Sequence, residues 1–154
     1  IMIKVDMAKA YDRVDWNFLL EVFRCFGFSL SFCDLIRACI SNIWYSVMLN
    51  GTMRGFFQGG RGLRQGDRLL PYLFIIIKEV LSRLLKQSVS SHKIGNFSQP
   101  RGTPQISHLM YADDIMIFLN GGKKSVRELL LVFEKYEIWS GQMINKEKTD
   151  IFFS

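Results

Sequence analysis

The spacing of hydrophobic residues divides the chain into helix-like and strand-like segments. The three- and four-residue spacing typical of one helix face begins at four places: after Asp15, after Ser29 or Ser31, at about Leu69 and after Ser125. Short apolar runs typical of strands occupy residues 1–5, 45–49, 52–56, 109–111, 115–119 and 151–153. Helices interleaved with largely antiparallel strands favour an α+β fold, with the helices packed on one face of an antiparallel sheet.

Capping residues set the expected ends of the helices. Asp15 is expected to cap the first helix and Gly27 to end it. A capping box of Ser125 and Glu128 is expected to open the last helix. The buried stripe of the second helix is predicted to consist of Phe32, Leu35, Ile36, Cys39, Ile40 and Ile43, and that of the last helix of Val126, Leu129, Leu130 and Phe133.

Turn-forming residues separate the strands. Asn50-Gly51 lies between two strand-like runs and predicts a hairpin with a type I′ turn, because both residues tolerate positive φ. The polar residues 88–105 predict a loop with one short strand at most. Asp113-Asp114 lies between two apolar runs and is expected at the tip of a second hairpin. This local pattern leaves two interpretations open, a solvated turn or a divalent-metal site.

The composition fits one well-packed domain. The chain has 154 residues, of which 49% are hydrophobic and 14% aromatic, and this composition argues against disorder. Residues 69–77, the longest apolar run, are too few to span a membrane, and the N-terminus lacks the features of a secretory signal. The 3 cysteines show no C-x-x-C spacing, so we expect a reducing intracellular compartment, nuclear or cytoplasmic. The formal net charge of +6 suits a polyanionic partner, although the basic residues are scattered.

Asp6 changes the balance for the second hairpin. It ends a strand that is predicted to be buried, where an unpaired carboxylate costs roughly several kcal/mol. If this strand lies beside the hairpin, Asp6 converges with Asp113 and Asp114 into a cluster of hard oxygen ligands, which select Mg²⁺ or Mn²⁺. Two such ions about 3.5–4 Å apart can activate an attacking hydroxyl and stabilise a leaving phosphate oxygen. Phosphoryl transfer is therefore the reaction class implied.

Four segments resemble, in order, the successive active-site motifs of reverse transcriptases: residues 5–14, 61–67, 111–114 and 140–149. The resemblance spans essentially the whole chain and is closest to the non-LTR (LINE-type) retrotransposon enzymes of plants. It implies the palm of a right-hand polymerase that acts on an RNA template, a DNA primer and deoxynucleoside triphosphates. Residues 1–154 are then a partial reverse transcriptase domain, with the fingers expected before Asp6 and the thumb after the last residue.

The resemblance also implies roles for the acidic and aromatic residues. Asp6 and Asp113 correspond to the main metal ligands, with Asp114 beside them. Tyr11 corresponds to an aromatic ring that lies against the sugar of the incoming nucleotide and excludes a 2′-hydroxyl. A core tyrosine remains the alternative for Tyr11.

Polar and basic residues outside the carboxylates receive further roles from the same resemblance. Gln65 and Gly66 are expected to line the nucleotide and template side, and Lys148 to lie near the pyrophosphate leaving group. The alternative interpretation of Lys148 is a solvated surface charge. Arg61 and Arg64 are candidates for contact with the nucleic-acid backbone, and scaffold ion pairs are equally compatible with their positions.

The chain departs from the family pattern in two places. Residues 68–71 read Arg-Leu-Leu-Pro where the family has Pro-Leu-Ser-Pro, and Lys78 directly follows the apolar residues 74–77. A lysine in such a run must either extend to solvent or shift its pKa. These departures keep open the hypothesis of a catalytically inactive, nucleic-acid-binding retroelement remnant.

Overall fold

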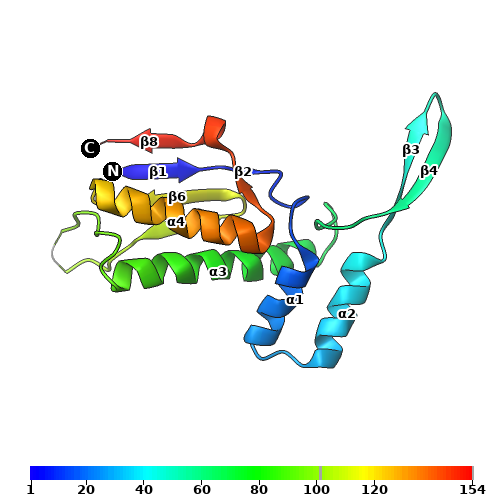
Figure 1. Cartoon of the computed structure of the whole chain (residues 1–154), viewed down its shortest axis with the longest axis horizontal. Coiled ribbons are helices and arrows are strands. Elements are labelled where there is room, and N and C mark those ends of the chain that lie inside the picture. The colour runs from blue at the N-terminus through cyan, green and yellow to red at the C-terminus, as the bar shows by residue number, and fades with distance from the viewer. Residues whose placement is uncertain (101, 154) are drawn as a thin grey trace.

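A four-stranded antiparallel sheet forms the centre of the computed structural model, which describes residues 1–100 and 102–153. The strand order is β5-β6-β1-β8. The bounds are Met2–Val5 for β1, His108–Tyr111 for β5, Asp114–Phe118 for β6 and Asp150–Phe152 for β8. The long helices α3 (Leu70–Ser90) and α4 (Lys123–Ser140) lie side by side along the sheet (Figure 1). The predicted α+β architecture is confirmed.

Alternating burial along the central strands explains why the helices cover one face. Ile3 and Val5 are buried in β1, whereas Lys4 between them is exposed. In the antiparallel register Ile3 pairs with Ile117 and Val5 with Ile115, and all four side chains belong to the hydrophobic core. Because side chains alternate between the two faces of a strand, these four share the covered face.

Helices α1 (Trp16–Cys25) and α2 (Leu30–Ser41) form a pair beside α3 (Figure 1). The Asp15 carboxylate accepts a hydrogen bond of 2.8 Å from the Phe18 backbone N–H, which confirms the predicted cap. The buried stripe predicted for α2 is wrong in part. Leu35 and Cys39 are exposed, and Cys33 is buried instead. Because α2 packs mainly against α1, its buried face is narrower than the sequence pattern indicates and is formed by Cys33, Ile36 and Ile40.

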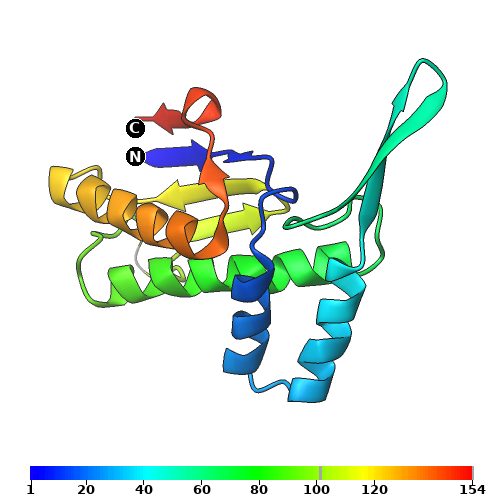
Figure 2. The ribbon, with the colours of Figure 1, turned by 45° about the vertical axis from the view of Figure 1, so that its right-hand side comes forward.

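The β3–β4 hairpin projects away from the rest of the molecule in both views (Figures 1 and 2). Its strands are Trp44–Leu49 and Thr52–Gln58. Asn50 and Gly51 have φ angles of 48° and 77°, as a type I′ turn requires, so the predicted hairpin is confirmed. Trp44 and Phe56 stack with their ring centroids 4.9 Å apart, and both remain about half exposed or more.

The capping box predicted for the last helix is wrong. Helix α4 begins at Lys123 after Gly122, so Ser125 and Glu128 lie inside it. The Ser125 hydroxyl instead accepts a hydrogen bond of 2.9 Å from the Gly95 N–H, and a Glu128 carboxylate oxygen lies 3.4 Å from Lys93 Nζ. Both side chains therefore bind the segment that follows α3. Leu130, predicted to be buried, is 62% exposed.

A long loop connects α3 to β5. Helix α3 continues to Ser90, and the described residues between it and β5 contain no strand, while Arg101 of this loop lies outside the described residues. Strand β2 (Met7–Ala8) pairs with β7 (Met143–Ile144), and the 3-10 helix η1 (Lys146–Lys148) leads into β8, which confirms the predicted final strand. None of the helices in the described part of the chain is long and apolar enough to cross a membrane.

A buried hydrogen-bonded pair, Tyr136 and Gln142, joins α4 to the turn that precedes β7. The Tyr136 hydroxyl donates to Gln142 Oε1 at 2.6 Å, and Gln142 Nε2 donates to the Ala10 carbonyl at 2.6 Å. Burial raises the pKa of Tyr136, so the hydroxyl keeps its proton and its role as a donor.

Replacing Tyr136 with phenylalanine should lower the free energy of unfolding by about 1–3 kcal/mol, because Gln142 then keeps a buried oxygen without a donor. Urea unfolding followed by circular dichroism measures the loss. Tyr72→Phe, at a side chain that is 67% exposed, is the matched control and should change stability little. Equal stability of the two variants would contradict this interpretation of the pair.

Candidate active site

The tip of the β5–β6 hairpin is a two-residue turn. Tyr111 pairs with Asp114, which leaves Ala112 and Asp113 as the connecting residues. Ala112 has a positive φ of 51°, in line with the tight turn. Asp113 is partly buried at the turn, and Asp114, as the first residue of β6, is exposed. The adjacent acids therefore have different backbone environments.

Asp6 reaches the same end of the sheet from β1. Val5 pairs with Ile115, so the next position along the antiparallel register sets Asp6 beside Asp114. The Asp6 carbonyl accepts a hydrogen bond of 2.9 Å from the Asn145 N–H, which fixes the chain where β1 ends. The backbone thus brings the three predicted carboxylate residues to one edge of the molecule.

Although the backbone brings these three residues together, their carboxylate groups do not form a cluster among the described residues. Asp114 Oδ1 lies 3.6 Å from Lys4 Nζ, and both side chains are about half exposed, so this ion pair contributes little stability. Among the described residues, no three His, Cys, Asp or Glu side chains lie close enough to hold a metal ion. Like charges repel one another, and the Asp114 carboxylate forms its ion pair with Lys4 on the neighbouring strand β1. As a donor set, carboxylate oxygens on adjacent strands fit a hard divalent cation.

The turn after β2 is attached on one side to the glycine-rich loop that precedes α3. Leu63 N–H donates to the Tyr11 carbonyl and Gly62 N–H to the Val14 carbonyl, both at 2.8 Å. Trp16 Nε1 donates to the Gly62 carbonyl at 2.7 Å. Gly62 has a φ of +89°, and a Cβ atom there would lie 2.6 Å from the Asp12 carbonyl oxygen. Only glycine fits this close approach of two backbones.

The opposite side of the same turn is attached to the end of α4. Asp15 N–H donates to the Ser140 carbonyl at 2.8 Å, in addition to the bond from Gln142 to Ala10. Residues 10–15 are thus held between two segments that come from distant parts of the sequence. No local pattern in the sequence indicates these roles of Trp16 and Gln142, because the partners of both side chains lie far away along the chain.

Tyr11 lies between the hydrophobic core and the carboxylates. Its ring centroid is 4.5 Å from that of Phe74, and the side chain is partly buried. Burial, and then the negative charge of Asp113, raise the pKa of the Tyr11 hydroxyl. The ring is therefore fixed by packing while its hydroxyl remains close enough to Asp113 to be affected by its charge.

Lys78 lies one helical turn after Phe74 and is only 5% exposed. Within the described chain its Nζ atom is buried without a hydrogen-bond partner, and it lies 5.1 Å from the centroid of the Phe74 ring. Burial lowers the pKa of Lys78 to about 8, and the charge of Asp113 acts in the opposite direction. Of the two outcomes expected for a lysine in this run, the structure shows a shifted pKa.

The other predicted site residues lie at the surface. Arg61, Arg64 and Gln65 are exposed in the loop before α3, and Lys148 is exposed in η1. None of the ion pairs between described residues includes either arginine, so scaffold ion pairs find no support there. Gly66 has a φ of +87°, and a Cβ atom there would have open space around it. Glycine is therefore favoured by the backbone conformation and not by a close contact.

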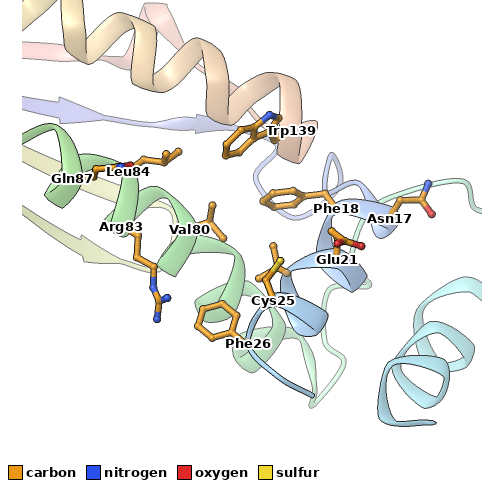
Figure 3. A pocket seen from close by; sticks show the side chains of 11 residues that line it. Asn17, Phe18, Glu21, Cys25, Phe26, Val80, Arg83, Leu84, Gln87 and Trp139 are labelled. Carbon is orange, nitrogen blue, oxygen red and sulfur yellow. The ribbon is translucent and has the colours of Figure 1, made fainter. Parts of the chain in front are cut away.

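Two cavities differ in their relation to these residues. One of about 310 Å³ lies between α3 and β5 and is lined by Lys78 and Ala112, next to the hairpin tip. A larger one of about 680 Å³ lies between α1, α3 and the end of α4 (Figure 3). Its lining is largely apolar and includes Phe18, Phe26 and Trp139, and it contains none of the predicted site residues. Neither of these two cavities is lined by a predicted site residue, but the smaller one adjoins the hairpin tip through Ala112, which directly precedes Asp113.

The chain is similar to known proteins over part or all of its length. The family described as reverse transcriptase (RNA-dependent DNA polymerase) matches residues 1–153. The retrovirus-related Pol polyprotein from type-1 retrotransposable element R2 of Popillia japonica is 28% identical over 152 residues, which cover 96% of this chain and 23% of the relative. An uncharacterized mitochondrial protein of Arabidopsis thaliana is 37% identical over 75 residues, or 49% of this chain and 62% of the relative. The chain thus spans less than two thirds of either relative.

Solved telomerase structures share the fold. Telomerase from Candida albicans, in complex with a TWJ fragment of telomeric RNA, gives a TM-score of 0.72 at 13% identity, covering 99% of this chain and 27% of that one. Apo telomerase from Candida tropicalis, truncated from its C-terminal domain, gives 0.69 at 20% identity, covering 97% and 30%. The fold class is therefore that of a polymerase palm of the reverse transcriptase type. The chain belongs to the reverse transcriptase family, and its relatives include Pol polyproteins of R2 retrotransposable elements.

Replacing Gly62 with alanine tests the attachment between the turn and the loop. The added methyl group requires the Asp12 backbone to move and places alanine at a positive φ, so the free energy of unfolding should fall by about 2 kcal/mol or more. Gly60→Ala is the control, since a Cβ atom there meets nothing within 4 Å. Chemical denaturation of both variants gives the comparison, and equal midpoints would show that the two backbones are not held in close contact.

Proposed function

We propose that this chain carries the active site of an RNA-directed DNA polymerase, with Asp6, Asp113 and Asp114 as its metal-binding carboxylates. The observation that supports this most directly is the register of β1 with β6, in which Val5 pairs with Ile115. This register sets the residue after β1 beside the hairpin tip in a chain of the reverse transcriptase family. Residues 1–154 then form the palm of a larger polymerase domain.

Asp6 and Asp113 would hold Mg²⁺ or Mn²⁺, and Asp114 lies next to them on β6. When bound, the ions lower the pKa of the primer hydroxyl and stabilise the leaving phosphate oxygen. The protein supplies positioning: the hydrogen bond from Asn145 to the Asp6 carbonyl fixes one ligand, and the hairpin turn fixes the other. Lys4 must release Asp114 before that carboxylate can turn toward its neighbours.

Tyr11 would act as the wall beside the sugar of the incoming nucleotide. Its ring packs on Phe74, and the hydrogen bond from the Leu63 N–H to the Tyr11 carbonyl holds the backbone that carries the ring. A wall that cannot move excludes the extra 2′-hydroxyl of a ribonucleotide. Tyr11 would thereby select deoxynucleoside triphosphates, and Tyr11→Val should reduce that selection when incorporation of the two nucleotide types is compared.

The exposed polar residues would meet the nucleic acid and the nucleotide. Arg61 and Arg64 would contact backbone phosphates, and Gln65 and Gly66 would line the nucleotide and template side. Lys148 would stabilise the pyrophosphate leaving group. An RNA template and a DNA primer are the partners that this assignment implies, in line with the formal net charge of +6.

Single-nucleotide addition to a DNA primer on an RNA template tests the proposal. We expect weak incorporation by the isolated chain that requires Mg²⁺ or Mn²⁺, and a decrease of about a hundredfold or more in Asp113→Asn, because an amide is a poor ligand for these ions. Asp34→Asn, an exposed position on α2, is the matched control and should incorporate like the parent chain.

Incorporation that persists in Asp113→Asn would contradict the proposed site. Binding of the primed template without any metal-dependent incorporation would favour the alternative of an inactive nucleic-acid-binding remnant. Robust extension by the isolated chain would show that the palm needs less support from the rest of the polymerase than we expect.

A further inference from the structure

A buried ammonium group beside the candidate site needs an explanation. Lys78 is 5% exposed, and its Nζ atom has no hydrogen-bond partner within the described chain. A buried cation without a partner is unfavourable, and an apolar side chain of the same length would avoid this cost. The nearby ring of Phe74, 5.1 Å from Nζ to its centroid, offsets only a small part of it.

The polar groups around Lys78 are already paired with one another. The cavity of about 310 Å³ that Lys78 lines is also lined by Glu79, Ser82 and His108. Glu79 lies 2.9 Å from Arg83 Nε, and the Ser82 hydroxyl lies 2.9 Å from His108 Nε2. Burial lowers the pKa of His108, so the imidazole stays neutral at pH 7 and offers no charge to Lys78.

One carboxylate remains on the side of the hairpin tip. Ala112 lines the same cavity, and Asp113 follows it directly in the turn. The negative charge of Asp113 also acts on both Lys78 and Tyr11. The Tyr11 ring and the Lys78 ammonium group both lie against the ring of Phe74. Lys78 and Tyr11 therefore both lie against Phe74, and the charge of Asp113 reaches both of them.

We propose that Lys78 is a resident cation of the carboxylate site, which stabilises the Asp113 carboxylate in the metal-free chain and weakens the binding of divalent cations there. This inference rests on the proposed role of Asp113 as a metal ligand. A fixed positive charge near the ligand repels an incoming ion of charge +2, and the low polarity of the cavity wall reduces screening of that repulsion. Lys78 is thus a positioning residue and not itself a ligand.

Direct measurement of Mn²⁺ binding tests the proposal without relying on polymerase activity. Free Mn²⁺ is followed by electron paramagnetic resonance during titration of the parent chain, Lys78→Met and Lys86→Met. Methionine preserves the length of the buried side chain, and Lys86 is an exposed lysine two turns further along α3. We expect Lys78→Met to bind Mn²⁺ about tenfold more tightly and Lys86→Met to bind like the parent. Asp113→Asn added to Lys78→Met should abolish the gain.

Equal Mn²⁺ affinity of the parent and Lys78→Met would overturn the proposal while leaving Asp113 as a ligand. If neither the parent chain nor Lys78→Met bound Mn²⁺, the proposal would be overturned as well, because removal of the Lys78 charge would then reveal no metal site. Binding that tightens in Lys78→Met but persists after Asp113→Asn would instead contradict the proposed function, since the ion would lie on other ligands.

Unfolding of the metal-free chain gives a second, independent readout. If Lys78 stabilises the Asp113 carboxylate, Asp113→Asn should lower the midpoint of denaturation more in the parent chain than in Lys78→Met. Asp34→Asn, far from the cavity in sequence and exposed on α2, should have the same small effect in both backgrounds. Identical effects of Asp113→Asn in the two backgrounds would show that the two charges are not coupled, and would overturn the proposal.

Discussion

The structure depends on the backbone hydrogen bonds that hold residues 10–15 between two distant segments. On one side the backbone N–H groups of Gly62 and Leu63 donate to this turn. On the other side the Ser140 carbonyl accepts from the Asp15 N–H, and the Gln142 side chain donates to the Ala10 carbonyl. These bonds connect the segments that resemble successive family motifs. Because buried backbone groups must find partners, a shift of any one segment would leave several groups unpaired at once. The relative placement of Tyr11, the glycine-rich loop and the C-terminal strands follows from this constraint.

The carboxylates lie near Tyr11 of that turn but are held mainly by strand register. A register shift of one residue would turn Asp6 to the other face of the sheet, away from its neighbours. The apolar pairs Ile3–Ile117 and Val5–Ile115 oppose such a shift, because the shift would move buried side chains of these pairs out of the hydrophobic core. Burial of aliphatic side chains thus fixes the positions of charged ones. Lys4 Nζ lies 3.6 Å from an Asp114 carboxylate oxygen, and the charge of Asp113 acts on Lys78, so both lysines partly offset the repulsion between the acids.

Much of this arrangement could be predicted from the sequence, and the exceptions have physical reasons. Local signals sufficed for the Asp15 cap, the Asn50-Gly51 turn and the acidic hairpin. The capping box failed because Ser125 and Glu128 bind a segment about thirty residues earlier in the chain, beyond the reach of a local pattern. The stripe of α2 failed because burial depends on which neighbour a helix meets. The close contact at Gly62 and the bridging role of Gln142 also arise from long-range contacts.

The central claim is that Asp6, directly after β1, and Asp113, in the β5–β6 turn, bind one divalent cation between them. Diffraction from crystals soaked in Mn²⁺, recorded at a wavelength where manganese scatters anomalously, tests it most directly. We predict an anomalous peak at about 2.0–2.3 Å from a carboxylate oxygen of each residue. A fully occupied Mn²⁺ peak elsewhere on the protein, with Asp6 and Asp113 not sharing an ion, would contradict the account.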